Sequence, residues 1–319
     1  MRCCGKGLVL AAAMVVSGPA RADRMPEPEP AVLVETTFWE WLADPAAHDV
    51  AVIVAKTASV VQLLEDPTGA EVGAQLLGDV YGMLRYGLRR SPDHPELLLA
   101  MGAVAEALGK PREALDAFER FLRTAPDQYR AADAWMRAGY LRAQLGDDDH
   151  AREAFQQAIM RPSPQPRVRD DALIGLAWLH LRGGHATRAI DLLSAAAAAP
   201  LAPYNPNPLP HLMLAIALDR DGQITRAHQV ITDLTKSRPL IDMITEHNHT
   251  LATLRYLDPL DRHYVAAFVY EVAGMLEDAL PEWQLYARAA DTPYRARART
   301  HARDIAALLQ ARFGAGGPR

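Results

Sequence analysis

Apolar residues recur every three to four positions along most of the chain, which is the spacing of one face of a helix. Valine and isoleucine stand singly within this pattern, with little of the strict alternation that marks a half-buried strand. Residues 32–64 are helical in pattern but irregular, and residues 71–90 predict one long helix that ends before Pro92. The pattern therefore predicts an all-α chain.

From residue 97 onward the helical pattern repeats itself in five units. These span residues 97–126, 134–159, 172–193, 211–231 and 263–290. The first four turn at glycines spaced 37, 38 and 38 residues apart, namely Gly109, Gly146, Gly184 and Gly222. Gly274 marks the fifth turn, after an insertion near 240–259. Each glycine is expected to end the first helix of its unit, and the fixed period predicts a stacked repeat architecture.

The units resemble the tetratricopeptide repeat, a helix–turn–helix motif of about 34 residues. In the first unit Gly102 is the small residue where the two helices of the motif cross, and Ala114 is the small residue opposite it. Phe118 matches the large residue that fills the gap to the next unit, and Pro126 stops the second helix. The resemblance covers roughly residues 95–293.

This resemblance implies a right-handed α-solenoid of stacked helix–turn–helix repeats, because no single unit can bury its apolar face alone. Residues 32–94 would form an irregular helical N-terminal cap, with Trp39 and Trp41 packed on the first repeat. Residues 294–319 would form a capping helix and a disordered tail. Pro281, inside the last second helix, is expected to kink that helix.

The N-terminus has the features of a secretory signal in residues 1–22. Arg2 and Lys6 precede the apolar stretch 7–16, and the sequence Ala-Arg-Ala at 20–22 is typical of a cleavage site. We expect a mature chain that starts at Asp23 and opens with a Pro- and Glu-rich linker over 23–31, exported to the periplasm or secreted. The alternative is an uncleaved anchor, but the stretch is short for a span of about 20 residues.

The cysteine positions and the net charge exclude some classes of function. Cys3 and Cys4 both lie in the predicted signal, so cleavage would leave a mature chain without disulfides, thiol catalysis or cysteine-bound zinc. Loss of Arg2, Lys6 and Arg21 would change the formal net charge from −5 to −8. A mildly acidic chain argues against nucleic acid as the main partner. Beyond the signal, no segment looks transmembrane, and we do not expect contact with a membrane.

The zinc motif H-E-x-x-H, the hydrolase motif G-x-S-x-G, the P-loop and the dinucleotide-binding glycine pattern are absent from the sequence, so we expect neither an enzyme nor a cofactor. One alternative remains in the insertion, where Glu246, His247 and His249 could share a metal in an extended loop and support a metal-dependent enzyme or accessory subunit. The other interpretation is a polar loop with surface histidines. Three aspartates at 147–149 favour a helix cap over a calcium site, because they lack the alternating ligands of a calcium loop.

In the tetratricopeptide family the first helices of successive units line a concave groove that binds the partner. Carried over to this chain, the central groove positions hold mostly apolar and aromatic side chains: Leu99 and Ala103, Met136 and Tyr140, Ile174 and Trp178, Leu212 and Ile216, and Tyr264 and Phe268. Chaperone-binding members instead hold basic residues and asparagine there. The resemblance therefore implies a protein partner that presents a helix or an apolar peptide.

Three further interpretations of these positions stay open. The side chains could pack between neighbouring first helices, could be covered by the protein's own N-terminal segment, or could bind a glycan or lipid. Polar residues at the groove rim would tune specificity, namely Glu106, Gln144, Arg182, Asp219, Arg220 and Glu271. The preferred function is a non-enzymatic scaffold of the cell envelope.

The C-terminal tail is basic, with arginines at 295, 297, 299 and 303. We favour a solvated capping helix, and the alternative is a surface for an acidic partner or a membrane.

Overall fold

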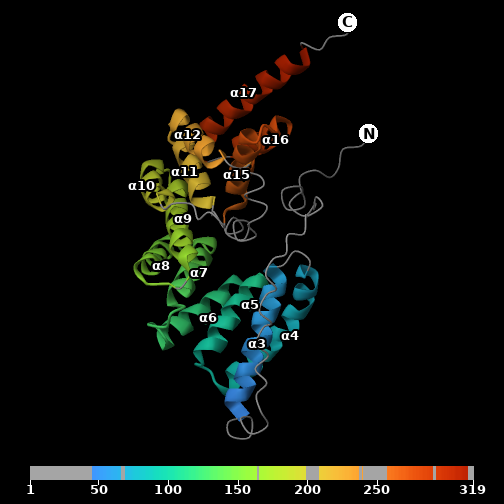
Figure 1. Ribbon diagram of the computed structural model, residues 1–319, viewed down its shortest axis with the longest axis vertical. Coiled ribbons are helices and arrows are strands. Elements are labelled where there is room, and N and C mark those ends of the chain that lie inside the picture. Colours follow the sequence, from blue (N-terminus) through green and yellow to red (C-terminus); the bar gives the residue numbers. More distant parts are fainter. Residues whose placement is uncertain are drawn as a thin grey trace. The chain divides into compact units, whose positions relative to one another are not determined.

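The computed structural model describes residues 45–65, 69–163, 165–198, 208–236, 239, 257–289 and 292–314 (Figure 1). Every regular element in these ranges is an α-helix, which confirms the all-α prediction. Several predictions lie outside the described residues: the signal over 1–22, the linker over 23–31, the cap residues Trp39 and Trp41, and the possible metal ligands Glu246, His247 and His249.

The chain divides into two compact units, residues 1–141 and 142–319. The first unit contains α3 (Pro45–Glu65), α4 (Ala70–Arg90), α5 (Pro95–Ala107), α6 (Pro111–Thr124) and most of α7 (Ala131–Gln144). Helices α3 and α4 pack against each other and against α5. Their shared core includes Val60, Leu84, Leu97 and Val104, all of which are buried.

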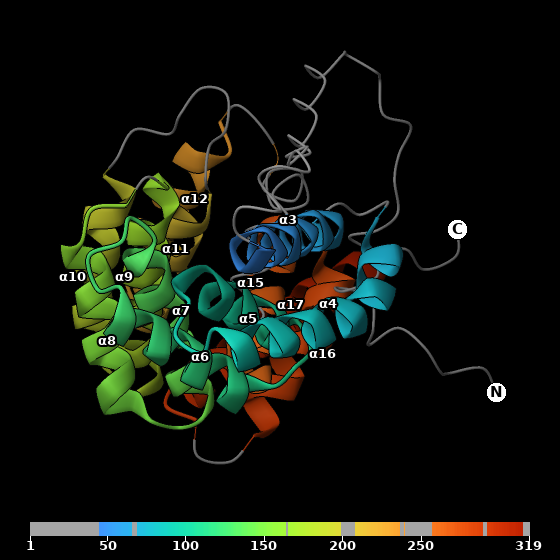
Figure 2. The same cartoon turned by 90° about the horizontal axis from the view of Figure 1, so that it is seen from below.

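The second unit contains the remaining helices: α8 (Asp148–Met160), α9 (Pro166–Arg182), α10 (Ala186–Ala197), α11 (Leu209–Arg220), α12 (Ile224–Leu234), α15 (Pro259–Val272), α16 (Leu276–Arg288) and α17 (Arg295–Gly314). Within it α9 packs on α10, α11 on α12, and α15 on α16. The first helices α9 and α11 also lie side by side (Figures 1 and 2). Helix α17 packs on α16 and closes the described chain.

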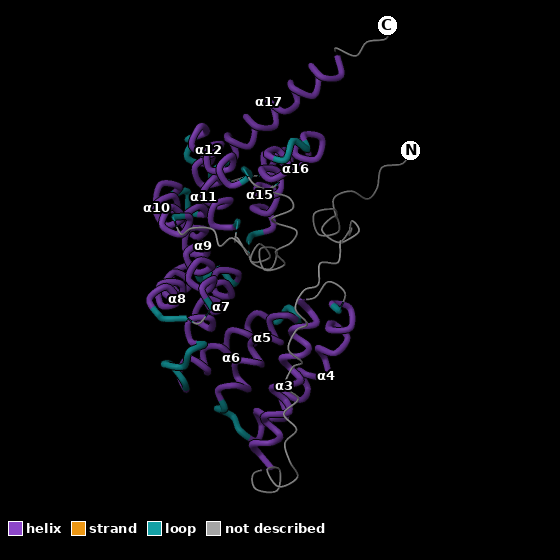
Figure 3. The backbone as a smooth tube through the Cα atoms, viewed as in Figure 1, coloured by secondary structure: helices purple, strands orange, loops and turns teal. Residues whose placement is uncertain are grey.

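The two helices of each repeat are joined by a short loop (Figure 3). The glycine in each loop has a left-handed backbone, with φ between 68° and 84°: Gly109, Gly146, Gly184, Gly222 and Gly274. In the first loop the Gly109 amide donates to the Glu106 carbonyl at 3.0 Å, and the Lys110 amide donates to the Ala105 carbonyl at 2.9 Å. This bonding satisfies carbonyls that a helix end leaves free. The structure confirms that these glycines end the first helices.

Gly102 of α5 is a point of close approach, as predicted, but its nearest neighbour is Phe118, which the sequence assigned to the gap toward the next unit. A Cβ atom added there would lie 2.5 to 2.7 Å from three atoms of the Phe118 ring of α6. Phe118 is fully buried, and so is Ala114. The missing side chain of Gly102 therefore makes room for the ring that fills the centre of this pair.

Two further observations concern single helices. Helix α16 continues across Pro281. Among the described residues, no helix combines the length and the apolar character that a membrane span requires.

Candidate functional site

Nine of the ten predicted groove residues are buried in the chain, with exposed fractions of 7% or less, and the tenth, Ala103, is half-buried. The nine buried residues are Leu99, Met136, Tyr140, Ile174, Trp178, Leu212, Ile216, Tyr264 and Phe268. The first three belong to the first unit and the other six to the second. Their role in binding stays a prediction, and in the free chain they belong to the core. A partner can contact them only where the residues that cover them move.

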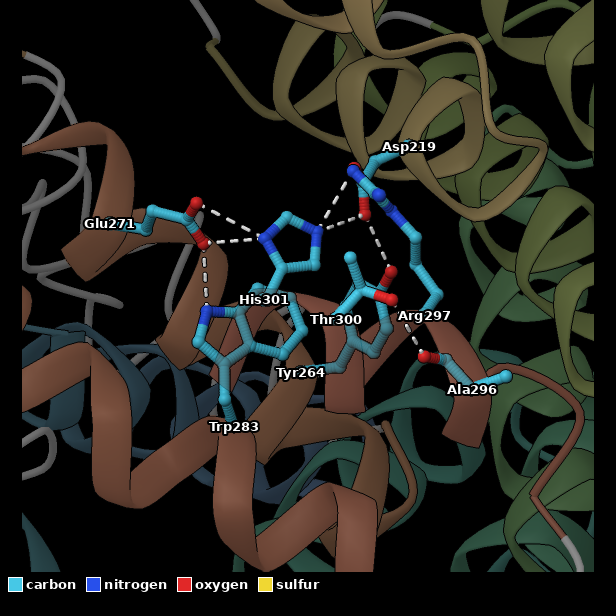
Figure 4. A network of polar contacts seen from close by, with 8 residues as sticks. All are labelled: Asp219, Tyr264, Glu271, Trp283, Ala296, Arg297, Thr300 and His301. Carbon is cyan, nitrogen blue, oxygen red and sulfur yellow. Dashed lines mark hydrogen bonds and ion pairs between the residues drawn. The ribbon is translucent and has the colours of Figure 1, made fainter. Parts of the chain in front are cut away.

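Buried and half-buried polar side chains gather at the C-terminal end of the second unit (Figure 4). We call this group the C-terminal network: Asp219 of α11, Tyr264 and Glu271 of α15, Trp283 of α16, and Arg297 and His301 of α17. Four helices contribute to it, and sequence separations reach 82 residues.

His301 lies at the centre of the C-terminal network. Its Nε2 atom is 3.0 Å from Oδ2 of Asp219, and its Nδ1 atom is 2.8 Å from Oε2 of Glu271. The imidazole ring stacks on the Trp283 indole with a centroid distance of 4.2 Å and an interplanar angle of 7°. The Trp283 Nε1–H group donates to Glu271 at 2.8 Å. Each ring nitrogen therefore faces a carboxylate, an arrangement that favours the doubly protonated ring.

Asp219 is the second centre of the network. Its side chain is 2% exposed, and it accepts hydrogen bonds from Arg297 Nε at 3.0 Å and from the Tyr264 hydroxyl at 2.7 Å. Together with His301, these donors surround the carboxylate. A buried charge without partners is costly, so the donors allow Asp219 to stay ionised inside the protein.

The titration of the network follows from this geometry. Burial would lower the pKa of His301, but hydrogen bonds and charge from Asp219 and Glu271 raise this pKa to about 9. Burial would raise the pKa of Asp219, but hydrogen bonds from His301, Arg297 and Tyr264 lower that pKa to about 2. Near neutral pH the network therefore holds an imidazolium and a carboxylate in contact.

Arg220 lies beside the C-terminal network, and its guanidinium group is surrounded by aromatic rings. Its guanidinium carbon is 4.2 Å from the centroid of the Tyr264 ring, 4.6 Å from that of Tyr294 and 4.9 Å from that of Trp178. Its Nη2 atom donates to Asp261 Oδ1 at 2.9 Å. Two predicted groove residues, Trp178 and Tyr264, thus contact a buried cation of their own chain, which accounts for part of their burial.

Two other predicted rim residues also have partners within the chain. In the first unit, Arg137 Nη1 is 3.0 Å from Glu106 Oε2, and Arg137 Nε is 3.2 Å from Asp133 Oδ1. The charge of Asp133 is the largest of the influences that raise the pKa of Arg137. In the second unit, Arg182 forms an ion pair with Asp148. In the free chain, several charged residues of the predicted rim therefore already have ion-pair partners within the chain.

The described residues contain no cluster of three or more side chains suited to bind a metal ion. Asp147 caps α8 as expected, because its carboxylate accepts a hydrogen bond from the backbone of His150. Asp147 also lies 2.8 Å from Nδ1 of the His150 ring.

The sequence did not single out His301, Trp283 and Asp261 as members of a polar centre. It also assigned Arg297 to a solvated face, whereas this side chain is only 18% exposed and pairs with Asp219. The one available signal was the spacing of Arg297 and His301, which places them one turn apart on the same face of a helix.

Comparison with known proteins supports the repeats directly. Residues 99–166 match the tetratricopeptide repeat family model. The mouse protein named Tetratricopeptide repeat protein 8 is 32% identical over 110 residues, which cover 34% of this chain and 20% of the mouse protein. The human protein of the same name is 32% identical over 109 residues. The match thus spans about a fifth of the length of these relatives.

A solved structure described as "Functional Characterization of Pseudomonas Aeruginosa pilF" supports the fold alone. It aligns with a TM-score of 0.50 and 12% sequence identity, covering 83% of this chain and 99% of the solved chain. Residues 99–166 therefore carry tetratricopeptide repeats, and the chain has an all-α fold of the tetratricopeptide type.

Proposed function

We propose that this chain is a non-enzymatic scaffold that binds a protein partner. The observation that carries the proposal is the repeated helical pair with its left-handed turn glycine, matched by the family model over residues 99–166. Tetratricopeptide-repeat proteins are generally non-enzymatic and bind protein partners. A fold alone does not name a ligand, so the partner follows from the chemistry of the binding face.

The proposed binding face is formed by the first helices of the repeats. Their predicted groove residues are apolar and aromatic, which suits a helix or an apolar peptide. In the second unit Tyr264 donates a hydrogen bond to the Asp219 carboxylate, and the Arg220 guanidinium lies over the Trp178 ring. Buried aromatic residues next to charged groups are typical of the centres of protein interfaces.

Affinity capture with the full chain tests this function. The chain with Trp178→Ala and Tyr140→Ala is compared with the wild type and with Tyr129→Ala, a control whose side chain is 68% exposed and lies outside the predicted groove. Proteins bound from envelope extract are quantified by mass spectrometry, and melting temperatures are measured in parallel. We expect the control to retain a partner that the double variant loses.

Two outcomes would contradict the proposal. One is that the wild type captures no protein above background. The other is that the double variant, still folded, retains the partner fully.

Export to the cell envelope is the second part of the proposal. Support comes from the basic, apolar and Ala-Arg-Ala segments of residues 1–22. N-terminal sequencing of the protein expressed with its full leader should begin at Asp23. A protein that keeps Met1 and stays inside the cell would contradict export without affecting the scaffold proposal.

A further inference from the structure

Helix α17 presents two different basic faces. Arg297 and His301 point toward carboxylates of α11 and α15 (Figure 4), whereas Arg299 and Arg303 on the same helix are exposed. The inward pair is one helical turn apart, so both side chains leave the same face of α17. This face contacts Asp219 directly through two ion pairs and Glu271 through a third.

The carboxylates that α17 contacts are the residues expected to select a partner. Asp219 and Glu271 stand at the predicted groove rim on two successive first helices, α11 and α15. Both receive charged donors from α17 within the described chain. Helix α17 thus pairs with the Asp219 and Glu271 carboxylates, which a binding face would otherwise offer to a ligand.

Three ion pairs contribute to the attachment of α17. Among the side chains of α17 that the structure describes, residues 295–312, only Ala298, His301 and Ile305 are buried, and Leu309 is half-buried. Leu308, further along the same helix, is 58% exposed. Because apolar burial is the main force that holds a helix in place, a helix whose described side chains bury little apolar surface depends more on its ion pairs. A competitor with the same charges could replace those pairs one for one.

We propose that α17 is an internal ligand of the binding face, and that the partner displaces it by presenting a basic helix with two cationic side chains one turn apart. This inference rests on the proposed scaffold function and names the chemistry of its partner. In the free chain Arg297 and His301 of α17 hold the site closed. In the complex the cations of the partner helix contact Asp219 and Glu271 and stack on Trp283.

Because α17 belongs to the same chain as the binding face, it competes strongly with a free helix for that face. A tethered segment acts at an effective concentration in the millimolar range, so a free helix of equal affinity binds only weakly to the wild-type chain. Weakening the contacts of α17 should therefore strengthen the binding of any helix with the same chemistry. This relationship provides the test.

The probe is a fluorescent peptide with the sequence of residues 293–314, titrated against the full chain. Three chains are compared: the wild type, Arg297→Ala with His301→Ala, and Arg299→Ala with Arg303→Ala. The last pair is a matched control, because it removes two arginines that face solvent on the same helix. We expect the first double variant to bind the peptide at least tenfold more tightly than the wild type and the control. A peptide that carries alanine at 297 and 301 should not bind.

Equal peptide affinity for all three chains would overturn the proposal, and so would full binding of the alanine peptide. A second measurement uses only the wild-type chain, in case the double variant does not fold. Hydrogen exchange of the chain's own residues 295–314 should become faster with millimolar native peptide and stay unchanged with the alanine peptide. Unchanged exchange with the native peptide would also overturn the proposal.

The same variants separate this inference from the scaffold proposal. One outcome is that the wild type captures a protein from envelope extract and the variant with Arg297→Ala and His301→Ala captures no more of it. The proposed role of α17 is then wrong, and the scaffold proposal is unaffected. If no chain captures a protein but the peptide binds as expected, α17 is a displaceable helix and the scaffold proposal is wrong.

Discussion

Nε2 of His301 lies 3.0 Å from Oδ2 of Asp219, although the two residues are 82 positions apart in the sequence. This contact joins the last described helix, α17, to α11, which belongs to an earlier repeat. Glu271 holds the other nitrogen of the same ring. A single imidazolium thus ties three helices together, and several consequences can be measured.

Removal of Asp219 should strongly destabilise the second unit. Asp219→Ala leaves Arg297 and His301 partly buried with fewer counter-charges, and breaking a buried ion pair from one side costs about 3–5 kcal/mol. The free energy of unfolding in urea measures the loss. Asp304→Ala is the control, because its pair with Arg303 is exposed and contributes at most about 1 kcal/mol. Equal losses in the two variants would contradict the role of the network.

Stability should depend on pH in two windows. The pKa of His301 is raised from 6.5 to about 9, so its contribution is complete below pH 6.5 and is lost as the pH rises through 9. The pKa of Asp219 is lowered from 3.8 to about 2, so its contribution is present above pH 3.8 and is lost as the pH falls through 2. Urea unfolding at a series of pH values tests both windows.

His301→Ala serves as the control for the alkaline window. The charged groups that face His301 are Asp219 and Glu271, and Arg297 shares Asp219 with it. The variant should be less stable at pH 6 and should lose little further stability between pH 6.5 and 9. A variant that loses as much as the wild type over this range would show that other groups cause the alkaline loss.

Two glycines in helices should respond to alanine with opposite signs. Gly102→Ala places a Cβ atom against the Phe118 ring and should destabilise the first unit by about 1–3 kcal/mol. Gly82→Ala, in α4, places a Cβ atom in open space. This variant should stabilise the first unit by up to about 1 kcal/mol, because alanine is a better helix former than glycine. Thermal melts of both variants suffice. A stabilising Gly102→Ala would mean that the crossing point has been misplaced.

The repeat architecture could be predicted from sequence because its signals are local and recur. Gly109 and its equivalents must adopt a left-handed backbone at each turn, and a residue without a side chain must face Phe118. Such requirements fix residue types at constant spacing, and the spacing is visible without coordinates. The helices and their turns follow from it.

The C-terminal network could not be predicted in the same way. It depends on which residues of α11, α15 and α17 meet, and these contacts occur once in the chain. Sequence periodicity carries no information about a contact such as that between Arg297 and Asp219, 78 positions apart. The groove positions show the same limit. Their place on the first helices could be predicted from the family pattern, but their burial could not. The burial of Trp178 against Arg220 depends on a contact between two different repeats.

Hydrogen exchange of the full chain, with and without its captured partner, tests the scaffold proposal most directly. Binding to the face of the first helices predicts slower exchange in α9, α11 and α15. Exchange in the second helices α10 and α12 should change little, and exchange in α17 should become faster as the partner displaces it. Slower exchange confined to α10 and α12, with the first helices unchanged, would contradict the account.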